Sequence, residues 1–328
     1  MEIGTSDFEK KEEEPPSNLV FKINPYLRKL AGVSAAVKRQ FFPSAEENEV
    51  CDFSSEDPLD EDKNILVKGL VQKYPRRVLL ELTMSCAAYC RFCTRRRMVS
   101  DIKKGQLEKK DIENVVDYLK KHEDINEVII SGGDPLMAQD ILVYALEKLS
   151  KLKQLTILRV HTRVPVSNPR LVGKKVLDAF ARIKKQAFYL SIHCEHPDEI
   201  TKEVTLAISK IRKTGAVLLS QTVFLKGVND SVETLKNLFT RLVELGIRPY
   251  YIYRCDPVKG AEHFLVPFER EIQIMTDLKK EVSGLAYPMY VIDAPGGSGK
   301  VPVGLNFWKG EKRAFWDYEG KRIEVVGP

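Results

Sequence analysis

The sequence predicts an α/β fold that is built on a parallel sheet. From residue 78 onward, short apolar runs alternate with longer segments whose apolar residues recur at helical spacing, and turn residues separate them. Strands are expected at Val78–Leu82, Glu127–Ser131, Leu155–Val160, Ala187–Ile192, Val217–Phe224 and Pro249–Tyr253. Helices are expected at about residues 107–122, 139–151, 173–185, 198–213, 231–245 and 267–282. Six strand–helix units imply parallel strands with right-handed crossovers.

Periodicity alone does not distinguish an open doubly wound sheet from a barrel. In both architectures the active site lies at the carboxyl ends of the strands. The residues that directly follow each strand are therefore the first candidates for function.

The first seventy residues read as an extension laid over this main domain. Residues 1–17 are polar and charged and are expected to form a mobile arm. Residues 18–72 form the extension, with helix-like spacing up to residue 42 and then an acidic loop. The core is expected over residues 73–285, and residues 286–328 form a C-terminal segment and tail.

Composition excludes several classes of protein. The chain has 328 residues, ordinary globular composition and no run of eighteen apolar residues, so no membrane span is expected. The formal net charge is +6, but the basic residues are scattered, so nucleic-acid binding is not expected. Six cysteines, three of them in one motif, and the lack of a signal peptide indicate the reducing cytoplasm.

Three cysteines follow the first strand at the spacing C-x3-C-x2-C, namely Cys86, Cys90 and Cys93. A loop that leaves a strand end can wrap three thiolates around one centre. Cysteine-only iron–sulfur sites use one thiolate per iron, so three cysteines leave one iron of a four-iron cluster open. A structural zinc site requires four ligands, and no nearby His or Cys completes one.

A glycine-rich stretch near the C-terminus ends in a lysine: Gly296-Gly297-Ser298-Gly299-Lys300. It is not a nucleotide P-loop, because Ala294 stands at the first glycine position and Val301 replaces the Ser or Thr that binds Mg²⁺. A lysine beside flexible backbone suits a Schiff base with an aldehyde, and glycine N–H groups can help to hold a phosphate.

These motifs resemble the lysine 2,3-aminomutase family of radical S-adenosylmethionine (SAM) enzymes over about residues 20–310. The segment Tyr74-Pro75-Arg76-Arg77 before the first strand and Thr94-Arg95-Arg96-Arg97 after the third cysteine carry the resemblance further. It implies a partial (β/α)6 barrel with an N-terminal helical extension and a short C-terminal extension. It also implies three cofactors: a [4Fe–4S] cluster, SAM and pyridoxal 5′-phosphate (PLP).

The resemblance assigns residues to each cofactor. Cys86, Cys90 and Cys93 would bind the cluster. SAM would lie beside Ser131, Gly132, Gly133, Asp134, His193 and Gln221. PLP would be carried by Lys300, with Gly296, Gly297, Gly299, Tyr74 and Arg77 around it. Lys73 replaces an arginine that is common in the family, which keeps the charge but loses the fork geometry.

The resemblance also implies a substrate and a reaction. Arg95 would bind the substrate carboxylate, and Asp256 and Asp293 would bind the ε-ammonium of lysine. The expected activity interconverts L-lysine and β-lysine by a SAM-initiated radical 1,2-amino migration, with a one-electron donor such as flavodoxin or ferredoxin and a homo-oligomeric enzyme. The alternatives are the same chemistry on arginine or glutamate, glutamate being disfavoured by the two aspartates, and β-lysine formation for modification of a translation elongation factor.

One departure bears on metal content. Clostridial-type members carry a zinc site that uses a cysteine in a Gly-Val-Asn-Asp-Cys context. Here Ser231 stands at that position and no cysteine follows Cys255, so zinc is not expected.

Overall fold

The computed structural model describes residues 19–49, 51–99, 105–294, 296, 299–307, 314–317 and 320–324. The arm expected over residues 1–17 and the candidate Gly297 lie outside the described residues. In the part that is described, no helix has the length and apolarity needed to cross a bilayer.

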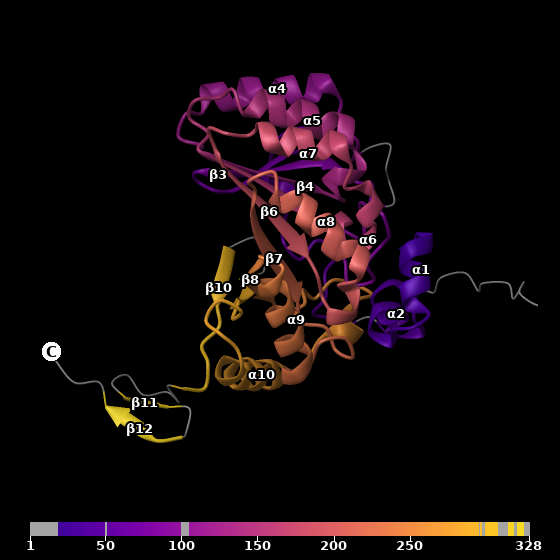
Figure 1. The fold of residues 1–328 in the computed structure, drawn as a ribbon, viewed down its shortest axis with the longest axis vertical. Helices are drawn as coiled ribbons and strands as arrows, with labels where there is room; N and C mark the ends of the chain where they lie inside the picture. Colours follow the sequence, from indigo (N-terminus) through magenta and orange to yellow (C-terminus); the bar gives the residue numbers. More distant parts are fainter. Residues whose placement is uncertain are drawn as a thin grey trace, which may run out of the picture.

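Ten strands of the described chain form one sheet in sequence order. They are β1 (Ile65–Val67), β2 (Leu70–Tyr74), β3 (Arg77–Thr83), β4 (Glu127–Gly132), β5 (Ile157–Thr162), β6 (Ala187–His193), β7 (Val217–Val223), β8 (Arg248–Tyr253), β9 (Met289–Ala294) and β10 (Gly299–Pro302). Strands β3 to β9 are parallel. The antiparallel strands β1 and β2 extend one edge and β10 extends the other, and these edges do not pair within the described chain. The sheet is therefore a partial, open barrel (Figure 1).

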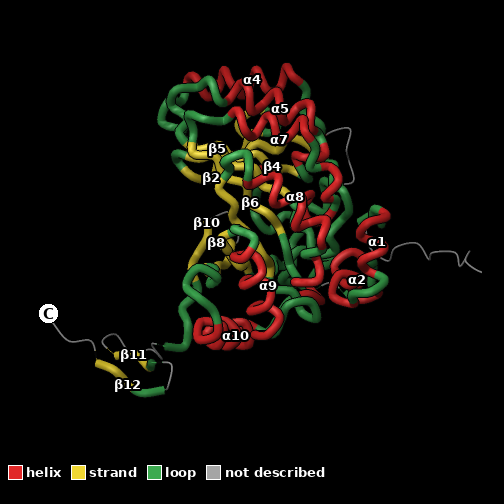
Figure 2. The backbone as a smooth tube through the Cα atoms, viewed as in Figure 1, coloured by secondary structure: helices red, strands yellow, loops and turns green. Residues whose placement is uncertain are grey.

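The helices cover one side of the curved sheet and its cysteine-bearing end. They are α1 (Pro25–Ala31), α2 (Ala35–Phe41), α4 (Lys109–Lys121), α5 (Gln139–Leu149), α6 (Val164–Ser167), α7 (Lys174–Arg182), α8 (Lys202–Arg212), α9 (Val232–Glu244) and α10 (Phe268–Glu281). Short 3-10 turns are η1 (Ala45–Asn48), η2 (Asp62–Asn64), η3 (Pro135–Met137), η4 (Pro169–Leu171), η5 (Pro197–Glu199) and η6 (Glu262–Phe264). Helices α4, α5, α7, α8, α9 and α10 follow one another around the outer side (Figures 1 and 2).

Alternation along the parallel strands separates the core from the interior of the barrel. Leu80, Ile130, Val160 and Leu190 are aligned across β3 to β6, and all four are buried in the core beneath the helices. The residues between them point to the other face, because side chains alternate along a strand. That inner face carries polar and charged groups, which makes it the place for a site.

The six predicted strand–helix units are confirmed, each within a few residues of its predicted bounds. Strands β1, β2, β9 and β10 were not predicted. The N-terminal extension is partly helical, as expected, and α1 and α2 pack on the cysteine loop: Leu27 and Phe41 share a buried cluster with Ala88. The extension also contributes β1 and most of β2 to the sheet. The short hairpin of β11 (Ala314–Trp316) and β12 (Arg322–Glu324) lies apart from the main body (Figure 1).

Candidate active site

The candidate residues converge on one cavity of ≈ 340 Å³ at the carboxyl ends of the parallel strands. Those that line it are Tyr74, Arg77, Cys86, Cys90, Cys93, Arg95, Ser131, Gly132, Gly133, Asp134, His193, Gln221, Asp256, Asp293, Gly299 and Lys300. Gly296 is exposed and does not line the cavity. Residues from eight separate segments of the chain thus meet at one place.

The three cysteines lie on the loop between β3 and α4 and face this cavity. Burial raises the pKa of all three thiols, and that of Cys90 reaches about 11. The charge of Cys93 also raises the pKa of Cys86 and of Cys90. A cationic metal centre bound by the three sulfurs would favour their thiolate forms.

Three cysteine thiols at one cavity are a donor set that suits a four-iron cluster with one open iron. Among the residues that the structure describes, no three His, Cys, Asp or Glu side chains are grouped so that they could hold one metal ion. In a four-iron cluster each thiolate bonds a different iron, so the sulfurs need not meet at a point. The expectation that zinc is absent stays a prediction. Ser231, which replaces the cysteine of zinc-containing relatives, caps helix α9 by accepting a hydrogen bond from Thr234 N.

The turn after β4 packs directly against the cysteine loop. Gly133 N donates to Thr83 O at 2.5 Å, and Asp134 N donates to Ser85 O at 2.8 Å. A Cβ at Gly133 would lie 2.6 Å from Ser85 O, and Gly132 has φ +118°, so both glycines are required by this contact. These peptide N–H groups are used within the protein and are not free for a ligand.

Asp134 is a buried structural carboxylate rather than an open one. Its oxygens accept hydrogen bonds from Thr162 Oγ1 (2.7 Å), Arg163 N (2.7 Å), Val164 N (3.0 Å) and Leu136 N (3.0 Å). Burial nevertheless raises its pKa. The side chain fixes the turn after β4 to the end of β5.

His193 and Gln221 are register neighbours on β6 and β7, and both line the same cavity as the cysteines. Gln221 Nε2 donates to Tyr253 Oη at 3.0 Å. His193 Nδ1 lies 3.7 Å from Glu195 Oε1, and its side chain is one third exposed. Both contribute polar groups to the lining of this cavity.

Lys300 lines the cavity from β10, the last strand of the sheet, whereas the cysteine loop follows β3 near the other edge. Its Nζ lies 2.9 Å and 3.0 Å from the two carboxylate oxygens of Asp293, which faces it on β9. Nζ also lies 5.3 Å from the ring centroid of Tyr253. Lys300 N donates to Tyr74 Oη at 3.2 Å, and this tyrosine ring is covered by the Arg77 guanidinium at 4.0 Å.

These surroundings fit an anionic, aromatic cofactor bound to Lys300. The cavity wall beside Lys300 carries three further cations, Lys73, Arg77 and Arg159, and the rings of Tyr250, Tyr251 and Tyr253. A phosphate requires such cations, and an aromatic ring packs against tyrosine.

The two candidate aspartates differ in their surroundings. Asp293 is paired with Lys300. Burial, followed by the charge of Asp293, raises the pKa of Asp256 to about 7, although Lys300 opposes the shift. A cation from outside would find both carboxylates on one wall of the cavity.

Arg95 is held by two carboxylates that the sequence did not single out. Glu61 accepts from Arg95 Nε at 2.7 Å and from Nη2 at 2.6 Å, which occupies one edge of the guanidinium. Glu81 Oε1 lies 2.9 Å from Nε but is not aligned for a hydrogen bond. Nη1 donates to Gly132 O at 3.4 Å, and Arg95 and Gly132 both line the cavity.

The pKa values of the two glutamates are shifted in opposite directions. Burial raises the pKa of Glu81 despite Arg95, whereas for Glu61 the charge and hydrogen bonds of Arg95 outweigh burial and lower the pKa. The charges of Arg95 and Lys73 both act on Glu61, and all three residues line the cavity.

Several polar residues of the site were not among the candidates, and they include Glu61, Glu81, Arg159, Arg163 and Tyr253. Glu81 and Arg159 could have been predicted from the sequence. Each is a charged residue inside an apolar strand, and such a residue needs a partner. Glu61 lies in an acidic stretch that predicted only a loop.

Residues 80–248, slightly more than half of the chain, match the Radical SAM superfamily. The chain is 37% identical over 314 residues to the L-lysine 2,3-aminomutase of Methanococcus maripaludis, which covers 93% of this chain and 72% of that protein. It is 39% identical over 272 residues to the enzyme of the same name from Clostridium subterminale, covering 83% of this chain and 65% of that protein. For the L-lysine 2,3-aminomutase of Acetoanaerobium sticklandii the identity is 37% over 289 residues, covering 87% and 69%.

Proposed function

The chain belongs to the lysine 2,3-aminomutase family of the radical SAM superfamily, and on this basis we propose that it is an L-lysine 2,3-aminomutase. It is an enzyme of the isomerase class. The proposed reaction interconverts L-lysine and β-lysine by radical 1,2-amino migration. The observation that carries the proposal is that one cavity contains three cysteine thiols, a lysine amine and a pair of aspartates.

In this proposal the residues act as ligands and positioning groups. Cys86, Cys90 and Cys93 would hold a [4Fe–4S] cluster, and His193 and Gln221 would line the place of SAM. Lys300 would hold PLP, and Arg77 and Lys73 would bind its phosphate. When bound, these groups supply one electron, a 5′-deoxyadenosyl radical and a carrier for the migrating amine. The protein binds the three components, orients them and excludes water.

Substrate choice is argued from charge. The Nη1 edge of Arg95 would bind the amino-acid carboxylate while Glu61 keeps the other edge fixed. Asp256 and Asp293 would bind the terminal ammonium of lysine. Asp293 is paired with Lys300 in this structure, so that ion pair would open when Asp293 binds the substrate. Arginine is the second candidate, since its side chain is also cationic; glutamate is disfavoured by the aspartate pair.

A one-electron donor such as flavodoxin or ferredoxin and a homo-oligomeric state are part of the proposal. β-Lysine produced by this chemistry could also serve to modify a translation elongation factor, which is the remaining alternative use of the same activity.

The test is an anaerobic assay with reconstituted protein, PLP, SAM, dithionite and L-lysine, with products identified by mass spectrometry and NMR. We expect β-lysine from the native chain and none from Cys90→Ala or Lys300→Ala. Borohydride should fix PLP on Lys300 in the native chain and in Cys90→Ala, but not in Lys300→Ala. SAM cleavage without any change in lysine would refute the substrate, and parallel reactions with arginine and glutamate would identify the replacement.

A further inference from the structure

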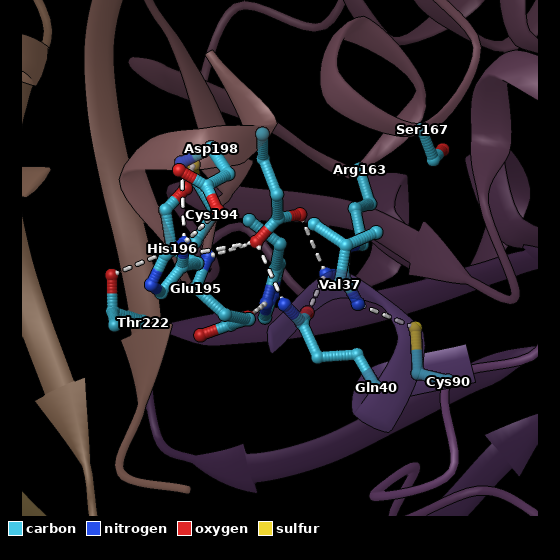
Figure 3. A network of polar contacts seen from close by, with 12 residues as sticks. Val37, Gln40, Cys90, Arg163, Ser167, Cys194, Glu195, His196, Asp198 and Thr222 are labelled. Atoms are coloured by element: carbon cyan, nitrogen blue, oxygen red, sulfur yellow. Dashed lines mark hydrogen bonds and ion pairs between the residues drawn. The ribbon is translucent and has the colours of Figure 1, made fainter. Parts of the chain in front are cut away.

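Arg163 links strand β5 to the cysteine loop through its side chain. Its Nη1 donates a hydrogen bond to Cys90 Sγ at 2.7 Å (Figure 3). Its Nη2 donates to Gln40 Oε1 and, at 2.8 Å, to Glu199 Oε2. The guanidinium is thus directed at one cysteine sulfur by partners on α2 and η5.

The partners of Arg163 are themselves fixed. Gln40 and Glu199 are both 0% exposed, and Gln40 Nε2 donates to Glu199 Oε1 at 3.2 Å. The same Glu199 oxygen accepts hydrogen bonds from Glu195 N and His196 N, both at 2.9 Å. The Arg163 backbone N–H donates to Asp134, so the residue also ties Cys90 to the turn after β4.

The positive charge of Arg163 lies in a desolvated place. The residue is only 9% exposed, and its guanidinium carbon lies 4.6 Å from the ring centroid of Phe41 and 5.4 Å from that of Phe92. Charges act more strongly on one another where water is excluded. A sulfur that accepts a hydrogen bond from such a cation is stabilised when it carries more negative charge.

We propose that Arg163 is a positioning residue that raises the reduction potential of the iron–sulfur cluster through its hydrogen bond to the sulfur of Cys90. The inference rests on the proposed assignment of Cys90 as a cluster ligand. Hydrogen bonds to the sulfurs and the charge around a cluster set its potential. A reduced cluster carries one more negative charge than the oxidised one, so Arg163 favours the reduced state that the reaction requires.

The test is a redox titration of the reconstituted full-length protein without SAM, PLP or lysine, with the reduced cluster followed by electron paramagnetic resonance. In Arg163→Gln we expect the ratio of reduced to oxidised cluster at a fixed solution potential to fall about tenfold, which is about 59 mV for a one-electron couple. Arg159→Gln is the matched control, because Arg159 lines the same cavity but pairs with Glu127 and His161. Its ratio should change less than twofold.

A ratio in Arg163→Gln within twofold of the native protein would overturn the inference, as would an equal fall in Arg159→Gln. Should Arg163→Gln retain no cluster, Arg163→Lys decides. Lysine keeps the charge but cannot bond Cys90, Gln40 and Glu199 with a planar fork, so we expect a fall of about threefold, and an unchanged ratio would refute the inference. If the native protein itself binds no four-iron cluster by iron and sulfide analysis, the proposed function fails instead.

Discussion

At the scale of single residues, the charge of Asp256 controls the wall that would receive the substrate ammonium. Burial and the neighbouring Asp293 raise its pKa to about 7. A raised carboxyl pKa means that the group is neutral below about pH 7 and anionic above it. The ε-amine of free lysine titrates near 10.4 and stays cationic throughout this range.

We therefore predict that kcat/KM for lysine rises as the pH increases through about 7. Below that value it should fall about tenfold per pH unit, because only the ionised Asp256 binds the cation. In Asp256→Asn the inflection near pH 7 should be absent, and kcat/KM should be lower than in the native enzyme above pH 7 but should converge with it at low pH, where Asp256 is neutral. The measurement is the pH profile under saturating SAM. An inflection that persists in Asp256→Asn would assign it to another group.

The residues that could be predicted from sequence are those whose chemistry depends on local spacing. Cys86, Cys90 and Cys93 lie on one loop, and Lys300 directly follows a glycine-rich stretch. Each can therefore be recognised from a short sequence motif. Glu61, Glu81 and Arg163 act through partners that are 14 to 123 positions away in the sequence, such as Arg95 and Gln40. Only the fold brings these pairs together.

At the scale of elements, the segment of residues 57–64 contributes Leu59 and Glu61 to the lining of the cavity. Asp57 and Asp62 pair with Arg97 at 2.9 Å and 3.0 Å, Lys73 Nζ donates to Leu59 O at 2.6 Å, and Gly296 N reaches Pro58 O at 3.4 Å. The segment connects the cysteine loop with the loop that carries Lys300. Its sequence predicted only an acidic loop.

Glu61 is the residue of this segment that reaches into the site, and we predict that Glu61→Ala raises the KM for lysine about tenfold with a smaller effect on kcat. Loss of a charged hydrogen-bond partner frees the Arg95 side chain, at a cost of about 1.5–3 kcal/mol. Asp62→Ala, on the exposed side of the same turn, is the control and should change KM less than twofold. A decrease in KM for Glu61→Ala would mean that Glu61 competes with the substrate carboxylate instead.

A second element, η1, is anchored to the cysteine loop by a buried ion pair. Glu47 accepts from Arg91 Nε at 2.8 Å and from Arg96 Nη2 at 2.8 Å, and the side chains of Glu47 and Arg91 are fully buried. We predict that Glu47→Ala lowers the free energy of unfolding by about 3–5 kcal/mol, since it leaves a buried cation without its counter-ion. The measurement is denaturant unfolding of the cluster-free protein.

Glu46→Ala is the matched control for that variant. The adjacent Glu46 pairs with Arg39 in a partly exposed bridge, whose loss should cost less than about 1 kcal/mol. Equal losses in the free energy of unfolding would show that the buried ion pair stabilises the fold no more than the partly exposed one.

The elements themselves were predictable where the pattern is long and repeated. Each of the six predicted helices presents apolar residues at helical spacing, as Val115, Val116 and Leu119 do in α4, and each was found. Strands β1, β2 and β10 are three to five residues long and pair antiparallel at the edges, so their apolar pattern is too short to be distinctive. Strand β9 leads into the glycine-rich Lys300 motif, and that segment was interpreted for its chemistry rather than for its secondary structure.

At the scale of the whole molecule, the sheet is an open barrel and the N-terminal extension packs on the cysteine loop. Tyr89 N and Arg91 N of the cysteine loop donate to Lys22 O and Gln40 O at 2.9 Å and 2.8 Å, so the extension supplies main-chain partners to that loop. Leu27 is fully buried beside Ala88, with Cys90 packed against the same cluster. The extension therefore separates the cysteines from solvent on one side.

Loosening this cover should expose the cluster to oxygen without removing any ligand. We predict that Leu27→Ala, which creates a cavity and costs about 2–5 kcal/mol, accelerates the loss of visible cluster absorbance in air several-fold. Leu242→Ala is the matched control: the residue is as buried, but it lies on α9 in the main core. A general loss of stability would accelerate bleaching equally in both variants. Faster bleaching in Leu27→Ala alone would identify the extension as the oxygen barrier, since the two substitutions remove the same atoms and differ in the surface that they loosen.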